Sequence, residues 1–127
     1  HTDDPQALTA LFNNWLSGFI QATLSEIFTI MQTRFAPLKL AKARLRIKLL
    51  KATWGSCRMP GPLITLNAAL IHSPVACIEY VIAHELAHIR HFNHGQAFYA
   101  LLAAMCPDWQ TQKKLLKTEY SSAIRKS

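Results

Sequence analysis

The sequence predicts an α+β fold with a small antiparallel or mixed sheet. Three observations predict it: helical apolar spacing in residues 1–36, an alternating pattern within residues 44–67, and a return to helical spacing in residues 73–127. The 127 residues are 50% hydrophobic and 17% charged, which supports one core and leaves little room for a second. We therefore expect residues 1–127 to form a single domain. The first residue is histidine rather than methionine, which suggests a piece of a longer chain.

Residues 1–36 are predicted to form a long amphipathic helix. Asp4 followed by Pro5 is typical of an N-cap and a first helical residue. Apolar residues then recur every three or four positions until Pro37 ends the pattern. Gly18 lies inside this helix and could divide it in two, because an interior glycine costs about 1 kcal/mol relative to alanine.

From residue 44 the apolar residues alternate with basic ones, as in a strand with one buried and one solvated face. The basic positions are Arg44, Arg46 and Lys48. Residues 44–53 and 63–67 are predicted to be neighbouring strands. The glycines and prolines within residues 54–62 predict a loop between them rather than a continued strand.

The C-terminal part of the chain is predicted to be helical. Ser73 before Pro74 is typical of a helix cap followed by a first turn. Asparagine, histidine and glycine at 93–95 should interrupt that helix, so that a third helix covers residues 96–106. Pro107 is expected to begin the last one.

The second predicted helix carries the pattern His-Glu-x-x-His. His84 and His88 are four residues apart, so both imidazoles lie on one helix face and can reach a single ion at about 2.0–2.1 Å. Glu85 projects beside them without being a ligand. An aliphatic stripe lies on the far side of the helix: Val75, Ile78, Ile82, Leu86 and Ile89. We therefore expect a buried helix with a recessed metal site.

A catalytic zinc site needs a third protein ligand. His94 is the first candidate, because it follows the predicted interruption, where the chain can turn back toward the ion. His91 would lie about 10 Å beyond His84 along an unbroken helix. His72 precedes the helix and is the last candidate in this order.

The formal net charge is +7, and it is unevenly placed. Eight bases and no acid occur between residues 27 and 78, and they form a basic belt spanning residues 34–58. Its members are Arg34, Lys39, Lys42, Arg44, Arg46, Lys48, Lys51 and Arg58.

The belt precedes the metal helix, so its charge is expected to bear on what is brought near the site. Arg44, Arg46 and Lys48 are candidate polyanion contacts. The alternative function is therefore a nucleic-acid-associated module with a structural zinc.

The three cysteines show no pairing pattern, which favours a reducing compartment. The chain also lacks a membrane-spanning run and the pattern of a signal peptide. We expect a soluble, cytoplasmic protein without a membrane partner. The oligomeric state stays open.

Taken together, the motifs resemble the YgjP-like metallopeptidase family, within the His-Glu-x-x-His zincin group. The resemblance covers about residues 40 to 117. It is carried by Trp54-Gly55-Ser56-Cys57, Leu66-Asn67, Tyr80 to His88, Asn93-His94 with Ala97-Phe98-Tyr99, and Pro107-Asp108-Trp109. It implies a zincin-like fold and one zinc ion held by His84, His88 and His94. Glu85 would then be the general base that activates a zinc-bound water against a peptide bond.

Further residues are candidates for supporting roles at the metal site because they lie near the zinc-binding pattern in the sequence. Tyr80, Tyr99 and His91 are candidate oxyanion donors, and Asp108 or Glu79 could accept the second N–H of a ligand histidine.

Two further candidates concern the substrate and the nucleophile. The strand around Ile64, Thr65 and Leu66 could offer its edge to a peptide or protein substrate. Cys57 as a nucleophile is a weaker alternative. The family is more distantly similar to SprT and Wss-type proteases, which cut proteins crosslinked to DNA, and a protease acting on DNA-bound proteins would suit the basic belt.

Overall fold

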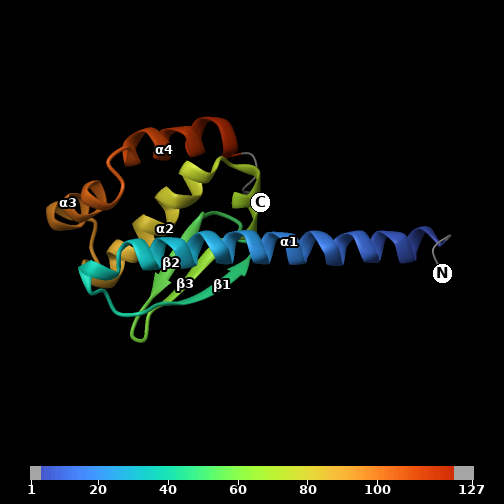
Figure 1. Ribbon diagram of the computed structural model, residues 1–127. Coiled ribbons are helices and arrows are strands. Elements are labelled where there is room, and N and C mark those ends of the chain that lie inside the picture. The colour runs from blue at the N-terminus through green and yellow to red at the C-terminus, as the bar shows by residue number, and fades with distance from the viewer. Residues whose placement is uncertain (1–3, 122–127) are drawn as a thin grey trace.

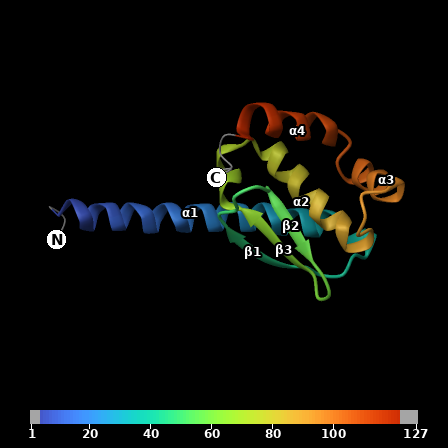
Figure 2. The ribbon, with the colours of Figure 1, turned by 180° about the vertical axis from the view of Figure 1, so that it is seen from behind.

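The computed structural model describes residues 4–121 and confirms the α+β class (Figures 1 and 2). The principal elements are α1 (Pro5–Arg34), β1 (Arg44–Lys48), β2 (Gly55–Arg58), β3 (Leu63–Asn67), α2 (Val75–Arg90), α3 (Gln96–Met105) and α4 (Trp109–Leu115). Short helical turns follow α1, β3 and α4 at Ala36–Leu38, Ala68–His72 and Leu116–Tyr120. Helices α1 and α2 pack together over one face of the sheet.

The sheet has the strand order β1-β3-β2 and is mixed. Strand β1 runs parallel to β3, and β2 runs antiparallel to it. The predicted neighbours in residues 44–53 and 63–67 are confirmed, although β1 ends at Lys48. The prediction of a loop throughout 54–62 is wrong, because residues 55–58 pair with β3 and only the proline-rich end of the stretch makes the connection.

Asn67 holds the long connection between β1 and β2. Its side chain is fully buried, and its amide nitrogen donates to the carbonyls of Leu50 at 3.0 Å and Thr53 at 2.9 Å. Its amide oxygen accepts from the backbone N–H of Ala69 at 2.9 Å. One buried side chain therefore fixes the path of the chain into β2.

Helix α1 is continuous through Gly18, so the predicted division does not occur. The N-cap prediction is confirmed, because the Asp4 carboxylate accepts from the backbone N–H of Gln6 at 3.0 Å. The buried residues of α1 are Leu24, Phe28 and Met31, all in its second half. The first half extends beyond the rest of the described chain and covers none of the core (Figure 1).

Helix α2 is the most buried helix, as expected, with nine buried residues out of sixteen. Pro74, rather than Ser73, occupies the cap position. The Ser73 hydroxyl instead donates to the Leu70 carbonyl at 2.8 Å, which closes the preceding turn. The last helix begins at Trp109 and not at Pro107. Among residues 4–121, every helix is too short or too polar to cross a bilayer.

Candidate metal centre

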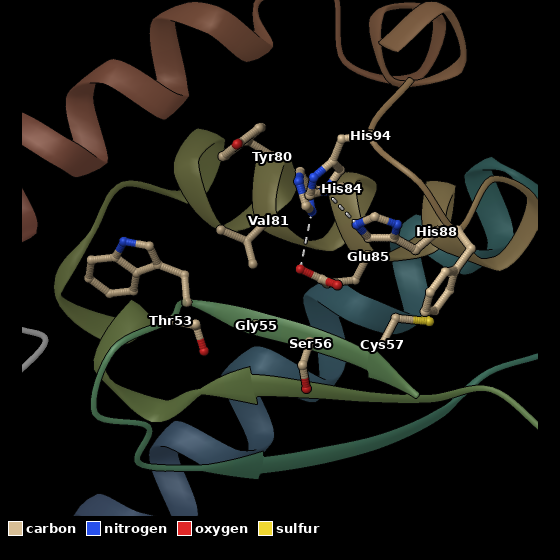
Figure 3. A pocket seen from close by; sticks show the side chains of 12 residues that line it. Thr53, Gly55, Ser56, Cys57, Tyr80, Val81, His84, Glu85, His88 and His94 are labelled. Carbon is tan, nitrogen blue, oxygen red and sulfur yellow. Dashed lines mark hydrogen bonds and ion pairs between the residues drawn. The ribbon is translucent and has the colours of Figure 1, made fainter. Parts of the chain in front are cut away.

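The end of α2 brings three histidines together. His84 and His88 lie one turn apart on α2, and the chain leaves the helix after Arg90 and returns at His94. The ring centroids are 4.9 Å apart for His84 and His88, 5.1 Å for His84 and His94, and 4.6 Å for His88 and His94. One ring nitrogen from each lies within 4.8 Å of the other two (Figure 3). His94 is therefore the histidine that joins the helical pair, whereas His91 and His72 lie outside the group.

The backbone at the end of α2 orients one of these rings. His91 is the C-cap residue, with φ −126° and ψ 99°, and its carbonyl accepts from His88 Nδ1 at 3.1 Å. This bond fixes the tautomer of His88 and leaves Nε2 free, 2.8 Å from His94 Nε2. His91 is therefore not one of the converging histidines, and it contacts the site through its backbone carbonyl; its role as an oxyanion donor stays a prediction.

Phe98 is a site residue that the sequence analysis did not single out. Its ring is fully buried, and its centroid lies 5.1 Å from His84, 4.5 Å from His88 and 4.9 Å from His94. It packs against all three imidazoles and restricts their rotation. It lies in the first turn of α3, whereas His94 precedes the Gly95 cap of that helix, so helical spacing does not relate the two residues.

Glu85 lies between α2 and β2. Glu85 is buried, with 5% of its surface exposed, and its Oε2 atom is 3.2 Å from His84 Nδ1. A cavity of about 450 Å³ opens beside it. The cavity is lined by Thr53, Trp54, Gly55, Ser56, Cys57, Tyr80, Val81, His84, Glu85, His88, Phe92 and His94 (Figure 3). Residues 54–57, which carry part of the family resemblance, therefore lie beside the three histidines.

Gly55 lets β2 approach the metal helix closely. A Cβ atom at this position would lie 3.1 Å from Val81 Cγ1, 3.2 Å from the Thr65 carbonyl oxygen and 3.3 Å from Glu85 Cγ. These separations are shorter than ordinary carbon contacts. A side chain at residue 55 would therefore push β2 and Glu85 apart by a few tenths of an ångström.

The environment of the cavity sets the protonation of three groups. Burial, with smaller contributions from Tyr99 and Glu85, raises the pKa of Tyr80 to about 12, so its hydroxyl stays protonated and can donate. Burial and Glu85 raise the pKa of Cys57 to about 11, which keeps it a thiol. Burial and the neighbouring imidazoles of His88 and His84 lower the pKa of His94, which favours the neutral form that a metal binds.

The chain was compared with known protein families to find the family in which this arrangement of residues occurs. The profile of a family described as YgjP-like, metallopeptidase domain matches residues 1–119. The chain belongs to the YgjP-like family. This YgjP-like protein is therefore a metallopeptidase, a hydrolase whose substrates are peptides or proteins.

Two solved structures share the fold. The crystal structure of the metallopeptidase zymogen of Pyrococcus abyssi abylysin is 18% identical with a TM-score of 0.66, and the overlap covers 77% of this chain and 95% of that one. The metallopeptidase zymogen of Methanocaldococcus jannaschii jannalysin is 22% identical with a TM-score of 0.57, covering 74% of this chain and 95% of that one. A comparison with curated protein sequences finds no match.

Two of the predicted site residues of this YgjP-like protein lie apart from the cavity. The Asp108 carboxylate accepts from Gln112 Nε2 at 2.8 Å and from Cys106 Sγ at 3.4 Å, and not from a ligand histidine. These bonds hold the pKa of Asp108 below its ordinary value. The Tyr99 ring stacks on Trp109, with centroids 5.1 Å apart, and its centroid is 6.2 Å from that of His94; Tyr99 is not among the residues that line the cavity.

The predicted substrate strand also needs correction. Ile64, Thr65 and Leu66 belong to β3, which is hydrogen-bonded to β1 on one edge and to β2 on the other. This strand has no free edge for a peptide. Within residues 4–121, β2 is an edge strand of the sheet, and it faces the cavity.

The basic belt of the YgjP-like protein does not face the cavity. Arg46 pairs with Thr65 and Cys57 with Ile64, which are adjacent residues of β3. Successive residues of a strand point to opposite faces, so the cations of β1 and the cavity-lining side of β2 lie on opposite sides of the sheet. Arg34, the first member of the belt, pairs instead with Glu79 at 3.5 Å. The cations of β1 therefore do not line the cavity, and their part in bringing a partner near the site stays a prediction.

Proposed function

We propose that this YgjP-like protein is a zinc-dependent peptidase in which His84, His88 and His94 hold one ion and Glu85 is the general base. The observation that carries the proposal is the convergence of three ring nitrogens within 4.8 Å, beside a buried glutamate. Three neutral nitrogen ligands with one open position are a common donor set for catalytic zinc. When bound, such an ion acidifies water and polarises a carbonyl.

In this proposal Glu85 transfers the proton, and Tyr80 donates a hydrogen bond to the oxyanion. The Glu85 carboxylate lies at the cavity wall, where it can take a proton from the attacking water and deliver it to the leaving amine. Tyr80 lines the same cavity and keeps its proton at neutral pH, so it can donate to the oxygen that becomes negative during the attack. Cys57 remains an uncharged thiol and needs no part in the reaction.

The substrate would bind as an added strand along β2. The sheet order leaves one edge of β2 unpaired in the described part of the chain, and Gly55, Ser56 and Cys57 of this strand line the cavity. An extended peptide can continue the ladder there through backbone hydrogen bonds. This assignment replaces the central strand that the sequence favoured.

The proposal is tested by replacing the base without disturbing the ligands. In the zinc-loaded protein, Glu85→Gln is expected to retain stoichiometric zinc and to lose cleavage of an unbiased peptide library by about 10²-fold or more. Glu79→Gln is the matched control, because it makes the same change on the same helix at the residue paired with Arg34. His84→Ala should lose the metal and cleavage together.

Two results would contradict the proposal. One is undiminished cleavage by Glu85→Gln. The other is a wild-type protein that holds less than one zinc ion per chain while its digest matches that of Glu85→Gln.

A second candidate function concerns the outer face of the sheet. Arg44, Arg46 and Lys48 of β1 share this face with Arg58 of β2, because Arg44 and Arg58 both pair with Leu63. The carboxylates of the described chain lie on helices or at their caps, so these cations face solvent without an acid among them. We propose that this face binds nucleic acid through phosphates and could bring DNA-bound proteins to the peptidase.

Binding to a fluorescent oligonucleotide across a salt series tests this second function. Affinity should fall steeply with salt, and Arg58→Glu should weaken it and reduce the salt slope by about one. Lys117→Glu makes a similar charge change at the far helical end and serves as the control. Equal binding by the two variants would contradict the assignment of this face.

A further inference from the structure

The first half of α1 displays large apolar side chains to solvent. Leu11, Phe12 and Trp15 are 59%, 58% and 62% exposed, and Leu8 and Phe19 are each 47% exposed. The rings form a ladder, with centroids 6.0 Å apart for Phe12 and Trp15 and 5.6 Å apart for Trp15 and Phe19. Contiguous exposed apolar surface of this kind is typical of an interaction site.

These side chains form a seam that is separate from the core-facing side of the helix. Positions 8, 12, 15 and 19 follow the four-three-four spacing of alternating d and a positions in two heptads. At about 100° per residue, they fall within a sector of about 60°. Leu24, Phe28 and Met31, which face the core, lie on nearly the opposite side, about 150° away. The seam is therefore not an extension of the protein's own core.

The seam also lacks charge. The sequence holds no acidic or basic residue from Pro5 to Ser25. A phosphate-rich partner or an anionic membrane surface would find nothing to pair with along this stretch. Helix α1 is moreover not apolar enough to span a bilayer. An uncharged, aromatic helix face is matched best by another uncharged, aromatic surface.

We propose that the seam binds a second copy of this chain, with the two α1 helices antiparallel about a twofold axis. When two such helices pair antiparallel, each layer of the interface contains an a residue of one helix and a d residue of the other. A register in which paired residue numbers sum to 27 places Leu8 of one copy opposite Phe19 of the other, and Phe12 opposite Trp15. The seam is thus complementary to itself in this direction.

Parallel pairing is disfavoured by the next seam position. After position 19 the four-three spacing reaches Ala22 and then Glu26. Parallel helices in register would bring Glu26 of both copies into one layer, where like charges repel. In the antiparallel register Glu26 lies beyond the layers that the seam makes.

The contact area suits a modest dimer. Five large side chains that are about half exposed contribute on the order of 100 Å² each, so two copies bury roughly 1,000 Å². The smaller residues between them bring the total near the lower limit of specific interfaces, about 1,200 Å². We expect a dissociation constant on the order of micromolar. In this dimer the half of α1 that projects from the single chain in Figures 1 and 2 would lie between two separate catalytic bodies.

Sedimentation equilibrium of the full chain, loaded with zinc, tests the proposal. The wild type should pass from monomer to dimer over the micromolar range, and Trp15→Glu should raise the dissociation constant about thirtyfold or more. Both residues are helix-compatible, so circular dichroism should show an unchanged fold. Leu49→Glu is the matched control, because it places the same charge on an exposed apolar residue outside the seam, and its dimer should match the wild type.

A pair of complementary variants tests the direction. Phe12→Lys alone and Trp15→Glu alone should each dimerise weakly, and an equimolar mixture should regain the wild-type affinity. In the antiparallel register the introduced lysine of one copy faces the introduced glutamate of the other. In a parallel pair, mixing would only relieve the repulsion between like charges and would not bring the lysine opposite the glutamate, so a mixture that stays well short of the wild-type affinity overturns the register. A wild type that stays monomeric to about 100 µM overturns the proposal, as does monomeric protein that sediments with uncharged phosphatidylcholine vesicles.

Discussion

Replacing Gly55 by alanine tests how closely β2 must approach the metal helix. The added methyl carbon would meet Val81 Cγ1 at 3.1 Å, the Thr65 carbonyl oxygen at 3.2 Å and Glu85 Cγ at 3.3 Å. The Thr65 oxygen belongs to the β3 backbone and cannot move independently. The strain must therefore be relieved by shifting β2 away from α2, or by displacing Glu85, by a few tenths of an ångström.

The expected magnitude follows from two opposing effects. Overpacking of this kind costs about 1–3 kcal/mol, and the stiffer unfolded chain offsets about 0.4–1 kcal/mol of that cost. We expect a net loss of about 1–2 kcal/mol in the free energy of unfolding, measured by urea denaturation. A misplacement of 1 Å at a catalytic group costs about 10²-fold in rate, so a shift of a few tenths should lower peptide cleavage about threefold to tenfold.

Gly18→Ala is the matched control. A Cβ atom there meets nothing within 4 Å, and the residue is inside a helix. This variant should be more stable by about 0.4–1 kcal/mol with unchanged cleavage. If Gly55→Ala is as stable as Gly18→Ala and cleaves peptides at the wild-type rate, the close approach of β2 plays no part in positioning Glu85.

Three further predictions concern single residues near the site. Asn67→Leu should lower the free energy of unfolding by about 1–3 kcal/mol in urea denaturation, because it removes the buried amide that donates to the partly buried carbonyls of Leu50 and Thr53; an unchanged midpoint would mean that water replaces the amide. At pH 8, with a pKa of about 11, the Cys57 thiol should react with iodoacetamide roughly a hundred times more slowly than a free cysteine, as followed by mass spectrometry, and rapid labelling would contradict its assignment as an inert thiol. Tyr80→Phe should retain zinc and lower kcat about 10²-fold with little change in KM, whereas Tyr99→Phe, outside the cavity, should behave as wild type; equal rates for the two variants would remove Tyr80 from the chemistry.

The metal centre could be predicted from the sequence because its geometry is mostly local. His84 and His88 are related by the helical period alone, and the run at 93–95 was sufficient to predict that His94 follows a break in the helix. Phe98 does not follow from this period, because His94 precedes the cap of α3, and no sequence pattern indicates that it packs against all three rings.

The sheet could not be predicted to the same depth. Alternation in residues 44–48 gives the two faces of a strand, but it does not say which strand is central or which has a free edge. That depends on the order β1-β3-β2, which is set by pairing between residues distant in the chain. The same gap explains why β2 was taken for a loop, and why the position of the basic face relative to the cavity could not be predicted.

Helix α1 shows a signal that was present in the sequence and not used. Its apolar residues were treated as one stripe, although those of the first half and those of the second half point about 150° apart around the axis. A change of face within an unbroken helix indicates two different partners. Only the second half packs against the protein's own core.

The end of α2 at Arg90 has a consequence for attempts to stabilise this protein. If the helix continued through residues 91–95, His94 would lie about 15 Å from His84 along the axis and could not share an ion with it. The weak helix formers at Asn93 and Gly95 therefore preserve the donor set by keeping the helix short. Substitutions that raise helix propensity there would increase the helical content and lengthen α2, and they would leave a two-histidine site. At this point of the chain, gains in local helical stability and retention of the metal are opposed.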